Sequence, residues 1–401
     1  MEKAINVKTF VTLIIFSQLL TAFVGRSLNP FAVYIGDSMQ LTNFQLGFLP
    51  TALFLGQFLA TLPMGFFADY IPTHRLILLL MLTVGGGFFL FATVQQTYIF
   101  ALLFITIAGL GYGGMHPVTN KMLIQLYPAQ KVTFPMGLKQ MSITLGSALS
   151  SILLLALAAK VGWQWAVKGA ALGLIIFAFV VYSMMRTYAG LFSTLRSTES
   201  SLLEQLKKLF TSKMLFFTTF IALLLMGMQV TFNTYLILFL SEIKGWSIYI
   251  AGLALAFSEI CGAAGRVLWG MMSDTWFKGN RWVVLMIITT WFPIALWALY
   301  EVNAVWLTVI IIASVGFTLS GFNGVWMNLA VESVPRPISG SASGYSVTFA
   351  SIGVFIIPPV FGYLTDLAGY LYGGIFLAVS SGVCLIILFW AYISSNRMIN
   401  I

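Results

Sequence analysis

Long apolar stretches alternate with short polar ones along the whole chain. Runs that are nearly free of charge extend over 8–36, 44–66, 75–95, 98–127, 135–158, 163–186, 213–241, 247–273, 281–300, 304–333, 338–364 and 370–395. A helix needs about 20 apolar residues to cross the hydrocarbon core of a bilayer, and runs of at least about 18 normally do so. The pattern therefore predicts twelve transmembrane helices.

The one long polar interruption lies between the sixth and seventh runs, from Arg186 to Lys213. Part of it, Ser201 to Phe210, is amphipathic, which favours a helix lying along the membrane surface. We therefore expect an N-terminal six-helix bundle over 1–186, a cytoplasmic linker with an amphipathic helix over 187–212, and a C-terminal six-helix bundle over 213–401.

Glycine and proline are placed inside several of these runs. Small residues such as those of the Gly109–Gly114 segment let membrane helices approach closely. Pro358 and Pro359 stand inside run eleven. The backbone groups that they free must be satisfied by neighbouring helices or by water.

Composition supports a membrane protein and narrows the function. The chain has 401 residues, of which 60% are hydrophobic and only 8% are charged, whereas about a quarter of an average soluble protein is charged. Cys261 and Cys384 lie in apolar runs and are interpreted as small buried side chains, not as a disulfide or a metal pair. No phosphate-binding loop and no zinc-protease motif is present. We therefore expect an all-α membrane protein that is not an enzyme and holds no metal or cofactor.

The net charge of +9 is explained by membrane orientation and not by nucleic-acid binding. With the N-terminus in the cytoplasm, thirteen of the twenty Lys and Arg residues fall on the cytoplasmic side. Two, Lys160 and Lys244, fall outside, and five lie within spans. The positive-inside rule therefore predicts a multi-pass protein of the plasma (inner) membrane with both termini in the cytoplasm.

One motif occurs twice, about two hundred residues apart. Each copy has a glycine, three residues, an aspartate, and an arginine six or seven positions further on, and each stands between two apolar runs. The copies comprise Gly65, Asp69 and Arg75 in the first half and Gly270, Asp274 and Arg281 in the second. A half-chain repeat of this kind is typical of transporters built from two similar bundles.

Six charged side chains lie inside the predicted spans: Arg26, Lys121, Lys139, Lys168, Glu259 and Arg266. Each costs roughly 3 kcal/mol or more at the bilayer centre unless it faces a cavity or a partner. Arg26 lies too deep to reach either surface easily, so it either faces an aqueous cavity or pairs with a helix end, whereas Lys168 can reach the outer surface. Lys121 and Lys139 can either reach a surface or converge on a cavity. Five basic groups against one acidic group favour an anion as the transported molecule, and arginine matches a carboxylate in bidentate fashion.

Glu259 and Arg266 share one helix face but stand two turns apart, about 10 Å, which is too far for a direct bond. Substrate is therefore a candidate partner for Arg266 and a proton for Glu259, with a fixed charge pair to another span as the alternative. His116 is a candidate proton relay or a packed hydrogen-bonding residue. Asn233 and Asn323 either join helices or line a site at the midplane.

The six-plus-six arrangement, the amphipathic middle segment and the doubled loop together resemble the major facilitator superfamily over essentially the whole chain. In that family the loop after span two reads roughly Gly-x-Leu-Ala-Asp-Arg-x-Gly-Arg. Gly65, Ala68, Asp69 and Arg75 match this loop, whereas Tyr70 replaces its first arginine. The resemblance implies that Asp69 caps a helix start in the other bundle and stabilises the outward-open state. It also implies that the second copy (Gly270, Asp274 and Arg281) does the same in its half.

Finer similarities point towards anion carriers. Arg26 and the Met136–Gln140 segment are similar to organic anion symporters, and the Arg266–Gly270 segment resembles monocarboxylate and oxalate carriers. In those carriers the arginine holds a substrate carboxylate. Ile105 stands where proton-coupled relatives often have an arginine, so proton coupling and exchange both stay open.

We therefore predict a secondary active transporter of a small organic anion, with a carboxylate as the expected class, that works by alternating access. Its expected partners are the anion, the lipid bilayer and protons, without nucleic acid, and it is expected to be a monomer. An efflux pump for drugs or siderophore-like compounds is the alternative. The expected substrate contacts are Arg26, Arg266, Lys139, Lys121, Asn233 and Asn323, and the expected coupling residues are Glu259 and His116.

Overall fold

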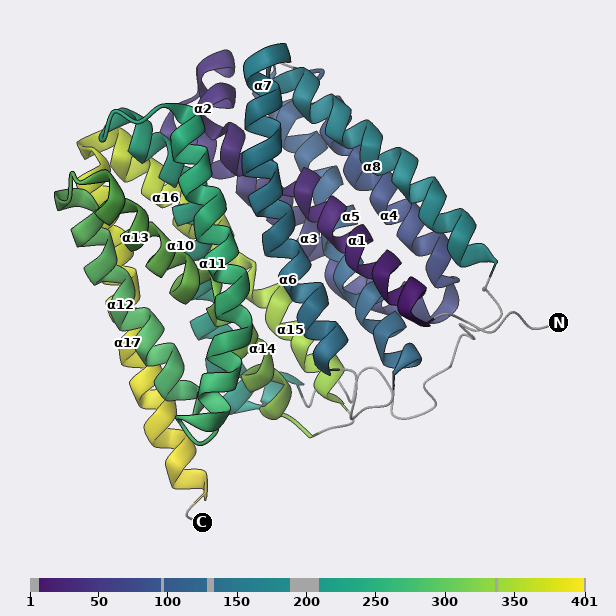
Figure 1. Ribbon diagram of the computed structural model, residues 1–401. Helices are drawn as coiled ribbons and strands as arrows, with labels where there is room; N and C mark the ends of the chain where they lie inside the picture. The colour runs from purple at the N-terminus through teal and green to yellow at the C-terminus, as the bar shows by residue number, and fades with distance from the viewer. Residues whose placement is uncertain (1–6, 95–96, 128–132, 188–208, 336–337, 400–401) are drawn as a thin grey trace. The chain divides into compact units, whose positions relative to one another are not determined.

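The computed structural model describes residues 7–94, 97–127, 133–187, 209–335 and 338–399, and all the regular secondary structure in these ranges is helical (Figure 1). It contains twelve helical segments that are long and apolar enough to cross a membrane. The predicted all-α fold with twelve spans is thereby confirmed. Of the predicted amphipathic segment at 201–210, only the last two residues fall within the described ranges.

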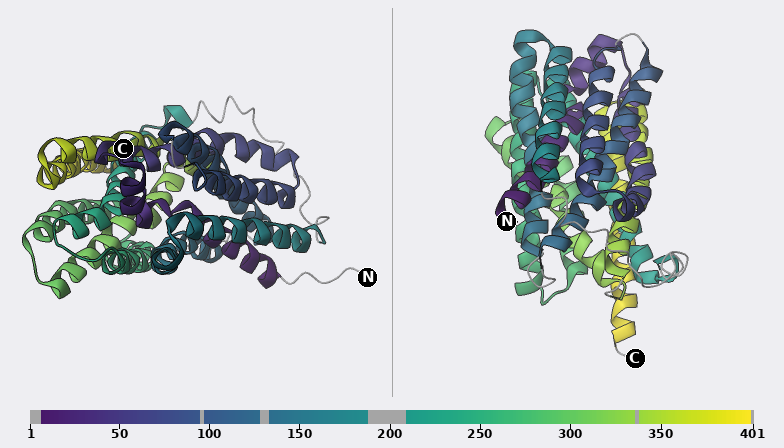
Figure 2. Two further views of the ribbon diagram at one scale, coloured as in Figure 1. Left: turned by 90° about the horizontal axis from the view of Figure 1, so that it is seen from above. Right: turned by 90° about the vertical axis from the view of Figure 1, so that its right-hand side faces the viewer.

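The helices form two compact units, one of residues 1–31 and 52–198 and the other of 32–51 and 199–401. Unit 1 holds α1 (Val7–Gly25), most of α3 (Asn43–Tyr70), α4 (Thr73–Phe91), α5 (Tyr98–Leu126), α6 (Thr133–Leu149), the π-helical turn η1 (Ser150–Leu154), α7 (Leu155–Val161) and α8 (Trp163–Arg186). Unit 2 holds most of α2 (Leu28–Met39), α10 (Lys213–Glu242), α11 (Ile248–Thr275), α12 (Arg281–Glu301), α13 (Val305–Val315), the π-helical turn η3 (Gly316–Ser320), α14 (Phe322–Glu332), α15 (Ser339–Ala350), α16 (Ile352–Ala368) and α17 (Tyr370–Ile399). Within each unit the helices run roughly along one common direction (Figure 2).

Close helix packing in unit 1 depends on glycine. An added Cβ at Gly111 of α5 would stand 2.4 Å from the carbonyl oxygen of Leu80 on α4, and one at Gly146 of α6 would stand 2.4 Å from that of Leu19 on α1. Neither approach leaves room for a side chain. Lipid supplies no hydrophobic drive between membrane helices, so contacts of this kind must come from small residues that bring backbones together.

In unit 2 the central helix is α10, which packs against α11, α15, α16 and α17. Most of its side chains are buried, including the polar Gln229, Asn233 and Tyr235. Polar groups on a helix that is covered on so many sides must find hydrogen-bond partners inside the protein. For this reason α10 carries much of the polar network described below.

The start of α3 belongs to unit 2, although α3 continues into unit 1. Asp366 on α16 accepts hydrogen bonds from the backbone amides of Asn43 (2.9 Å) and Phe44 (2.8 Å). These amides are among the unpaired donors at a helix N-terminus, where a carboxylate also interacts favourably with the helix dipole. Tyr235 donates its hydroxyl proton to the carbonyl oxygen of Asn43 at 2.5 Å. Residues 32–51 therefore group with the C-terminal half of the chain, which the predicted boundary at 187–212 does not anticipate.

The prolines of run eleven lie inside α16, and the helix in this run is interrupted earlier, at Ser351. Proline at 358 removes the donor that would normally bond the carbonyl of Val354. Thr51 of α3 supplies the missing donor, since its hydroxyl bonds that carbonyl at 2.9 Å. The freed backbone group is therefore satisfied by a neighbouring helix, as such groups in a membrane protein must be.

Candidate functional site

Arg26 lies at a break in the first span, between α1 and α2. At Gly25 an added Cβ would stand 2.7 Å from a ring carbon of Tyr112, so only glycine lets the buried Tyr112 ring lie directly on α1. The Tyr112 hydroxyl accepts a hydrogen bond from Arg26 Nε at 3.1 Å. The guanidinium also lies 5.4 Å from the centre of the Phe54 ring, and the His116 ring meets the Tyr112 ring edge-on at 6.1 Å. These contacts to neutral groups help to orient the guanidinium.

Arg266 of α11 lies in a polar network at the π-helical turn η3. Its Nε donates to the carbonyl oxygen of Ser320 at 3.2 Å. Asn323 donates to the same carbonyl (3.2 Å) and to Gln229 Oε1 (3.1 Å), and Gln229 Nε2 donates to Ser320 Oγ (3.1 Å). Two predicted site residues, Arg266 and Asn323, are thus brought together at one backbone carbonyl. Single π-helical turns of this kind are frequent at functional sites.

A second pair continues this network along the same two helices. Asn233 Nδ2 donates to Glu259 Oε1 at 2.5 Å, and both side chains are buried, with exposed fractions of 1% and 3%. Asn233 lies one turn beyond Gln229 on α10, and Glu259 lies two turns before Arg266 on α11. Residues four apart share a helix face. The structure therefore places Asn233, Glu259, Asn323 and Arg266 in one connected part of unit 2.

The two lysines predicted in unit 1 have different surroundings. Lys139 of α6 has an exposed fraction of 0%, and its ammonium group donates to Asn120 Oδ1 at 2.5 Å. The ammonium group of Lys121 of α5 donates instead to the backbone carbonyl of Ala68, near the end of α3. A cation is favourable at the C-terminal end of a helix. Lys139 is therefore a buried charge with an uncharged partner, whereas the contact of Lys121 supports the end of α3.

The second copy of the repeated motif forms a network of ionised groups. Arg281 Nη1 donates to Asp274 Oδ1 at 2.9 Å, and Arg281 bonds Glu332 in bidentate fashion through Nε (2.7 Å) and Nη2 (2.5 Å). The Arg281 side chain is 11% exposed, whereas those of Asp274 and Glu332 are 62% and 52% exposed. Asp274 is therefore paired with the arginine of its own motif. The network links the ends of α11 and α14 through the start of α12.

Sequence reasoning did not identify Glu332, which looks like an ordinary residue at the end of an apolar run. A signal was present, because Glu332 stands three residues before Pro335 as Gln125 stands three residues before Pro128. The first half of the repeat therefore has an amide where the second has a carboxylate. The Oε1 atom of Gln125 is buried and has no hydrogen-bond partner in the described part of the chain.

The first copy of the motif differs from the second. The Asp69 side chain lies outside the residues that the structure describes, and Arg75 is exposed. An added Cβ at Gly65 or at Gly270 would meet nothing within 4 Å. Packing within either unit therefore does not require these two glycines.

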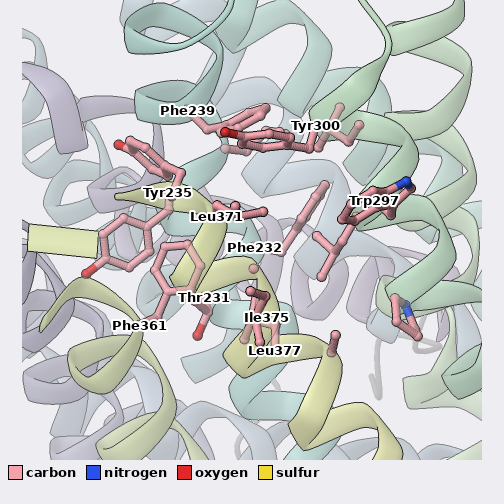
Figure 3. Close-up of a pocket in the computed structure, with 17 residues that line it drawn as sticks. Thr231, Phe232, Tyr235, Phe239, Trp297, Tyr300, Phe361, Leu371, Ile375 and Leu377 are labelled. Atoms are coloured by element: carbon pink, nitrogen blue, oxygen red, sulfur yellow. The ribbon is translucent and has the colours of Figure 1, made fainter. Parts of the chain in front are cut away.

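A pocket of about 120 Å³ lies in unit 2 among α10, α12, α16 and α17. Figure 3 shows it lined by aromatic and aliphatic side chains, with Phe232 and Trp297 pointing towards one another across it. The described residues of its lining include no charged side chain and none of the predicted site residues. An apolar pocket of this kind offers an anion no counter-charge, so it is distinct from the candidate site at Arg266.

Comparison with known proteins identifies relatives over the whole chain. The family model for the Major Facilitator Superfamily matches residues 14–290 and 250–397. A probable sulfoacetate transporter of Cupriavidus necator is 22% identical over 398 residues, which cover 92% of this chain and 90% of the relative. A probable galactarate/D-glucarate transporter of Bacillus subtilis is 25% identical over 187 residues, which cover 45% of this chain but only 41% of the relative.

Solved structures of low sequence identity share the fold. A bacterial homologue of the human lysosomal transporter Spinster has a TM-score of 0.77 at 15% identity and covers 98% of both chains. A D-xylose-proton symporter has a TM-score of 0.76 at 13% identity, with 96% of this chain and 97% of that chain covered. At these identities the likeness concerns the fold alone.

Proposed function

We propose that this chain, which belongs to the major facilitator superfamily, is a secondary active carrier of a small organic anion that it binds through a carboxylate or a similar acidic group. The chain is a multi-pass membrane protein and not an enzyme. Carriers built from two similar bundles bind substrate near the midplane and expose it to either side in turn. We take alternating access of this kind as the mechanism here.

One observation carries the proposal: each unit has an arginine beside an interruption in a membrane helix. Arg26 stands at the break between α1 and α2, and Arg266 bonds the carbonyl of Ser320 at the end of η3. Irregular backbone at membrane depth is tolerated only where it is buried in protein or lines a cavity, and interrupted helices commonly form the substrate sites of transporters. A guanidinium at such a place is suited to a carboxylate, which it can bind through two parallel hydrogen bonds.

Two further findings support an anionic substrate. The predicted spans contain five basic side chains and one acidic side chain. This excess of positive charge favours anions in a cavity with low-dielectric walls. The relatives include probable transporters of galactarate/D-glucarate and of sulfoacetate, and these substrates carry carboxylate or sulfonate groups. We propose Lys139 and Asn323 as additional substrate contacts, because one is a buried cation and the other lies beside Arg266. Lys121 and Asn233 remain candidates for this site, and Glu259 and His116 remain candidates for coupling.

The doubled loop is proposed as the conformational switch of the carrier. In the second half the switch consists of Gly270, Asp274 and Arg281, with Glu332 as the additional partner that the geometry adds. Charged groups that bond one another in one conformation and exchange partners in another can hold a transporter in discrete states. Gly65, Asp69 and Arg75 are proposed as the first-half counterpart.

The proposal is tested by uptake into proteoliposomes of D-glucarate and sulfoacetate, with neutral D-xylose for comparison. We expect uptake of an acid and not of the sugar. Arg26→Ala and Arg266→Ala should each abolish this uptake while leaving expression and the melting temperature near those of the wild type. Lys168→Ala is the matched control, because Lys168 is also a cation within a span but lies over Trp165, 4.8 Å from its ring centre. Full uptake by either arginine variant removes that residue from the site, and transport of the sugar but of neither acid contradicts the anion assignment.

A further inference from the structure

The apolar pocket of unit 2 is a narrow space that runs along its helices. On α17 its lining extends from Tyr370 to Ala378, and a helix rises about 1.5 Å per residue, so this stretch is about 12 Å long. The pocket volume is about 120 Å³, somewhat less than the roughly 150 Å³ of an engineered apolar cavity that holds one benzene molecule. A small volume spread over this length has the shape of a stretch of hydrocarbon chain and not of a lipid headgroup.

The polar groups of the lining are directed away from the pocket. The Thr231 hydroxyl donates to a carbonyl of its own helix at 2.8 Å, the Tyr235 hydroxyl donates to the carbonyl oxygen of Asn43, and the Tyr370 hydroxyl donates to Glu242 at 3.0 Å. A buried water needs two to four polar partners, whereas a cavity with apolar walls stays dry and takes up apolar molecules. The lining therefore selects an apolar occupant.

The pocket leads from the surface of unit 2 into its interior. Phe232 and Leu377 form part of its inner wall and are buried, whereas Trp297 of α12 and Ile375 of α17 line it and are exposed (Figure 3). Both of these helices are long and apolar enough to cross a membrane. Their exposed apolar side chains therefore face the hydrocarbon of the bilayer, which supplies the occupant that the pocket selects.

We propose that this pocket binds one hydrocarbon chain of a bilayer phospholipid. The chain enters past Trp297 and Ile375 and lies against Phe232 and Leu377. This site is separate from the anion site of the proposed function, because its lining includes neither Arg266 nor Asn323.

The end of the pocket near Tyr300 and Tyr370 is suited to the polar part of the lipid. Tryptophan and tyrosine are typical of the membrane–water interface, and α12 ends at Glu301 while α17 begins at Tyr370. The Lys244 ammonium group donates to the carbonyl oxygen of Tyr300 at 2.6 Å and interacts electrostatically with Glu301. Charges of both signs at this level match a zwitterionic headgroup, which carries a phosphate and an ammonium group.

A chain in the pocket contacts the rings that hold the start of α3. The rings of Tyr235 and Phe361 both line the pocket, and their centres lie 4.7 Å apart. The same Tyr235 bonds the carbonyl of Asn43. Filling an apolar cavity restores packing contacts that its walls otherwise lack. The bound chain should therefore stabilise the contact between α16 and the start of α3.

Photolabelling tests the site in the full-length protein. The vesicles contain phosphatidylethanolamine and phosphatidylglycerol, with a small fraction of phosphatidylethanolamine that carries a diazirine at the end of one chain. After illumination, mass spectrometry should find label on the buried Phe232 and Leu377 as well as on exposed residues such as Phe389. Lipid that only surrounds the protein cannot reach the buried pair, so label confined to exposed residues overturns the proposal.

Two neighbouring substitutions on α17 provide a matched comparison. Ala378→Phe places a ring in the pocket and should abolish labelling of Phe232 and Leu377. Val379→Phe adds the same ring at an exposed position outside the lining and should leave that labelling unchanged. Both variants should keep the label on Phe389. Undiminished labelling of the buried pair in Ala378→Phe contradicts the assignment.

Thermal unfolding in detergent gives a second measurement and shows whether the variants are folded. Added phosphatidylethanolamine should raise the melting temperature of the wild type and of Val379→Phe, because a ligand that binds only the native state stabilises it by mass action. The rise should be smaller for Ala378→Phe. An equal rise in all three proteins would indicate a general effect of lipid and count against the pocket. If Ala378→Phe does not fold, the labelling pattern of the wild type decides. Neither measurement uses an anion, so a negative result leaves the proposed carrier function untouched.

Discussion

The Tyr112 hydroxyl is one determinant of how the Arg26 guanidinium is held, because Arg26 Nε donates to it at 3.1 Å. Tyr112→Phe removes this oxygen but keeps the ring that packs against Gly25. We expect binding of D-glucarate to weaken by about 1 kcal/mol, roughly fivefold, which is the usual contribution of one such hydrogen bond. The measurement is the ligand-induced shift of the melting temperature of the purified protein over a range of ligand concentrations.

Tyr249→Phe is the control for this prediction, since Tyr249 is an exposed tyrosine at the start of α11. It should bind as the wild-type protein does. A Tyr112→Phe protein with unchanged affinity would show that the orientation of Arg26 does not matter for the anion. An equal loss in both variants would point to a general effect on folding.

Individual candidate site residues were predictable from sequence where burying the side chain in an apolar run costs free energy whatever its neighbours are. Arg26, Glu259 and Arg266 stand out because an ionised group within an apolar run needs a partner or a cavity. Their partners were not predictable in the same way. The carbonyl of Ser320 becomes an acceptor for Arg266 through the local backbone of η3, and Glu332 lies at a run end where charge is inexpensive. Sequence therefore reveals the groups that need a partner but not the groups that provide one.

The contact between α3 and α16 allows a test at the level of helices. Thr51→Val keeps the shape of the side chain but removes the hydroxyl that bonds the Val354 carbonyl, which Pro358 leaves without its usual donor. We expect a loss of about 1 kcal/mol in the free energy of unfolding, in the range of hydrogen bonds between membrane helices and of buried groups left unpaired. Thermal unfolding in detergent is the measurement. Thr51→Ser keeps the hydroxyl and should melt close to the wild type, so equal melting of the valine and serine variants would contradict this account.

Whole helices were predicted well because each apolar run must be about as long as the bilayer is thick. All twelve predicted runs correspond to helical spans. The interruptions within spans were not predicted, because the break at Arg26, the turns η1 and η3 and the break at Ser351 leave the hydropathy of their runs unchanged. An added residue in a π-helical turn alters hydrogen bonding and direction without altering composition.

At the scale of the whole chain, the repeated motif correctly indicated a carrier fold with two similar halves, which the family match and the solved structures support. The grouping of residues 32–51 with unit 2 was not predictable from the repeat. It depends on contacts between parts of the chain more than three hundred residues apart, such as Asp366 with the amides of Asn43 and Phe44. A sequence repeat shows only that one half of the chain resembles the other. These contacts instead join residues of the first half to residues of the second, so the repeat does not indicate them.

The membrane orientation of the whole molecule is predicted from the distribution of lysine and arginine, and this prediction can be tested on one helix. Thr275 at the end of α11 and Glu301 at the end of α12 are both exposed, and α12 crosses the membrane between them. In a variant with Cys261 and Cys384 replaced by serine, we expect Glu301→Cys to react with a membrane-impermeant maleimide in intact cells. Thr275→Cys should react only after the cells are opened, because the Lys278 and Arg281 side of this loop is predicted to be cytoplasmic. The reverse pattern would place both termini outside and would require thirteen of the twenty basic residues to lie on the side where the positive-inside rule disfavours them.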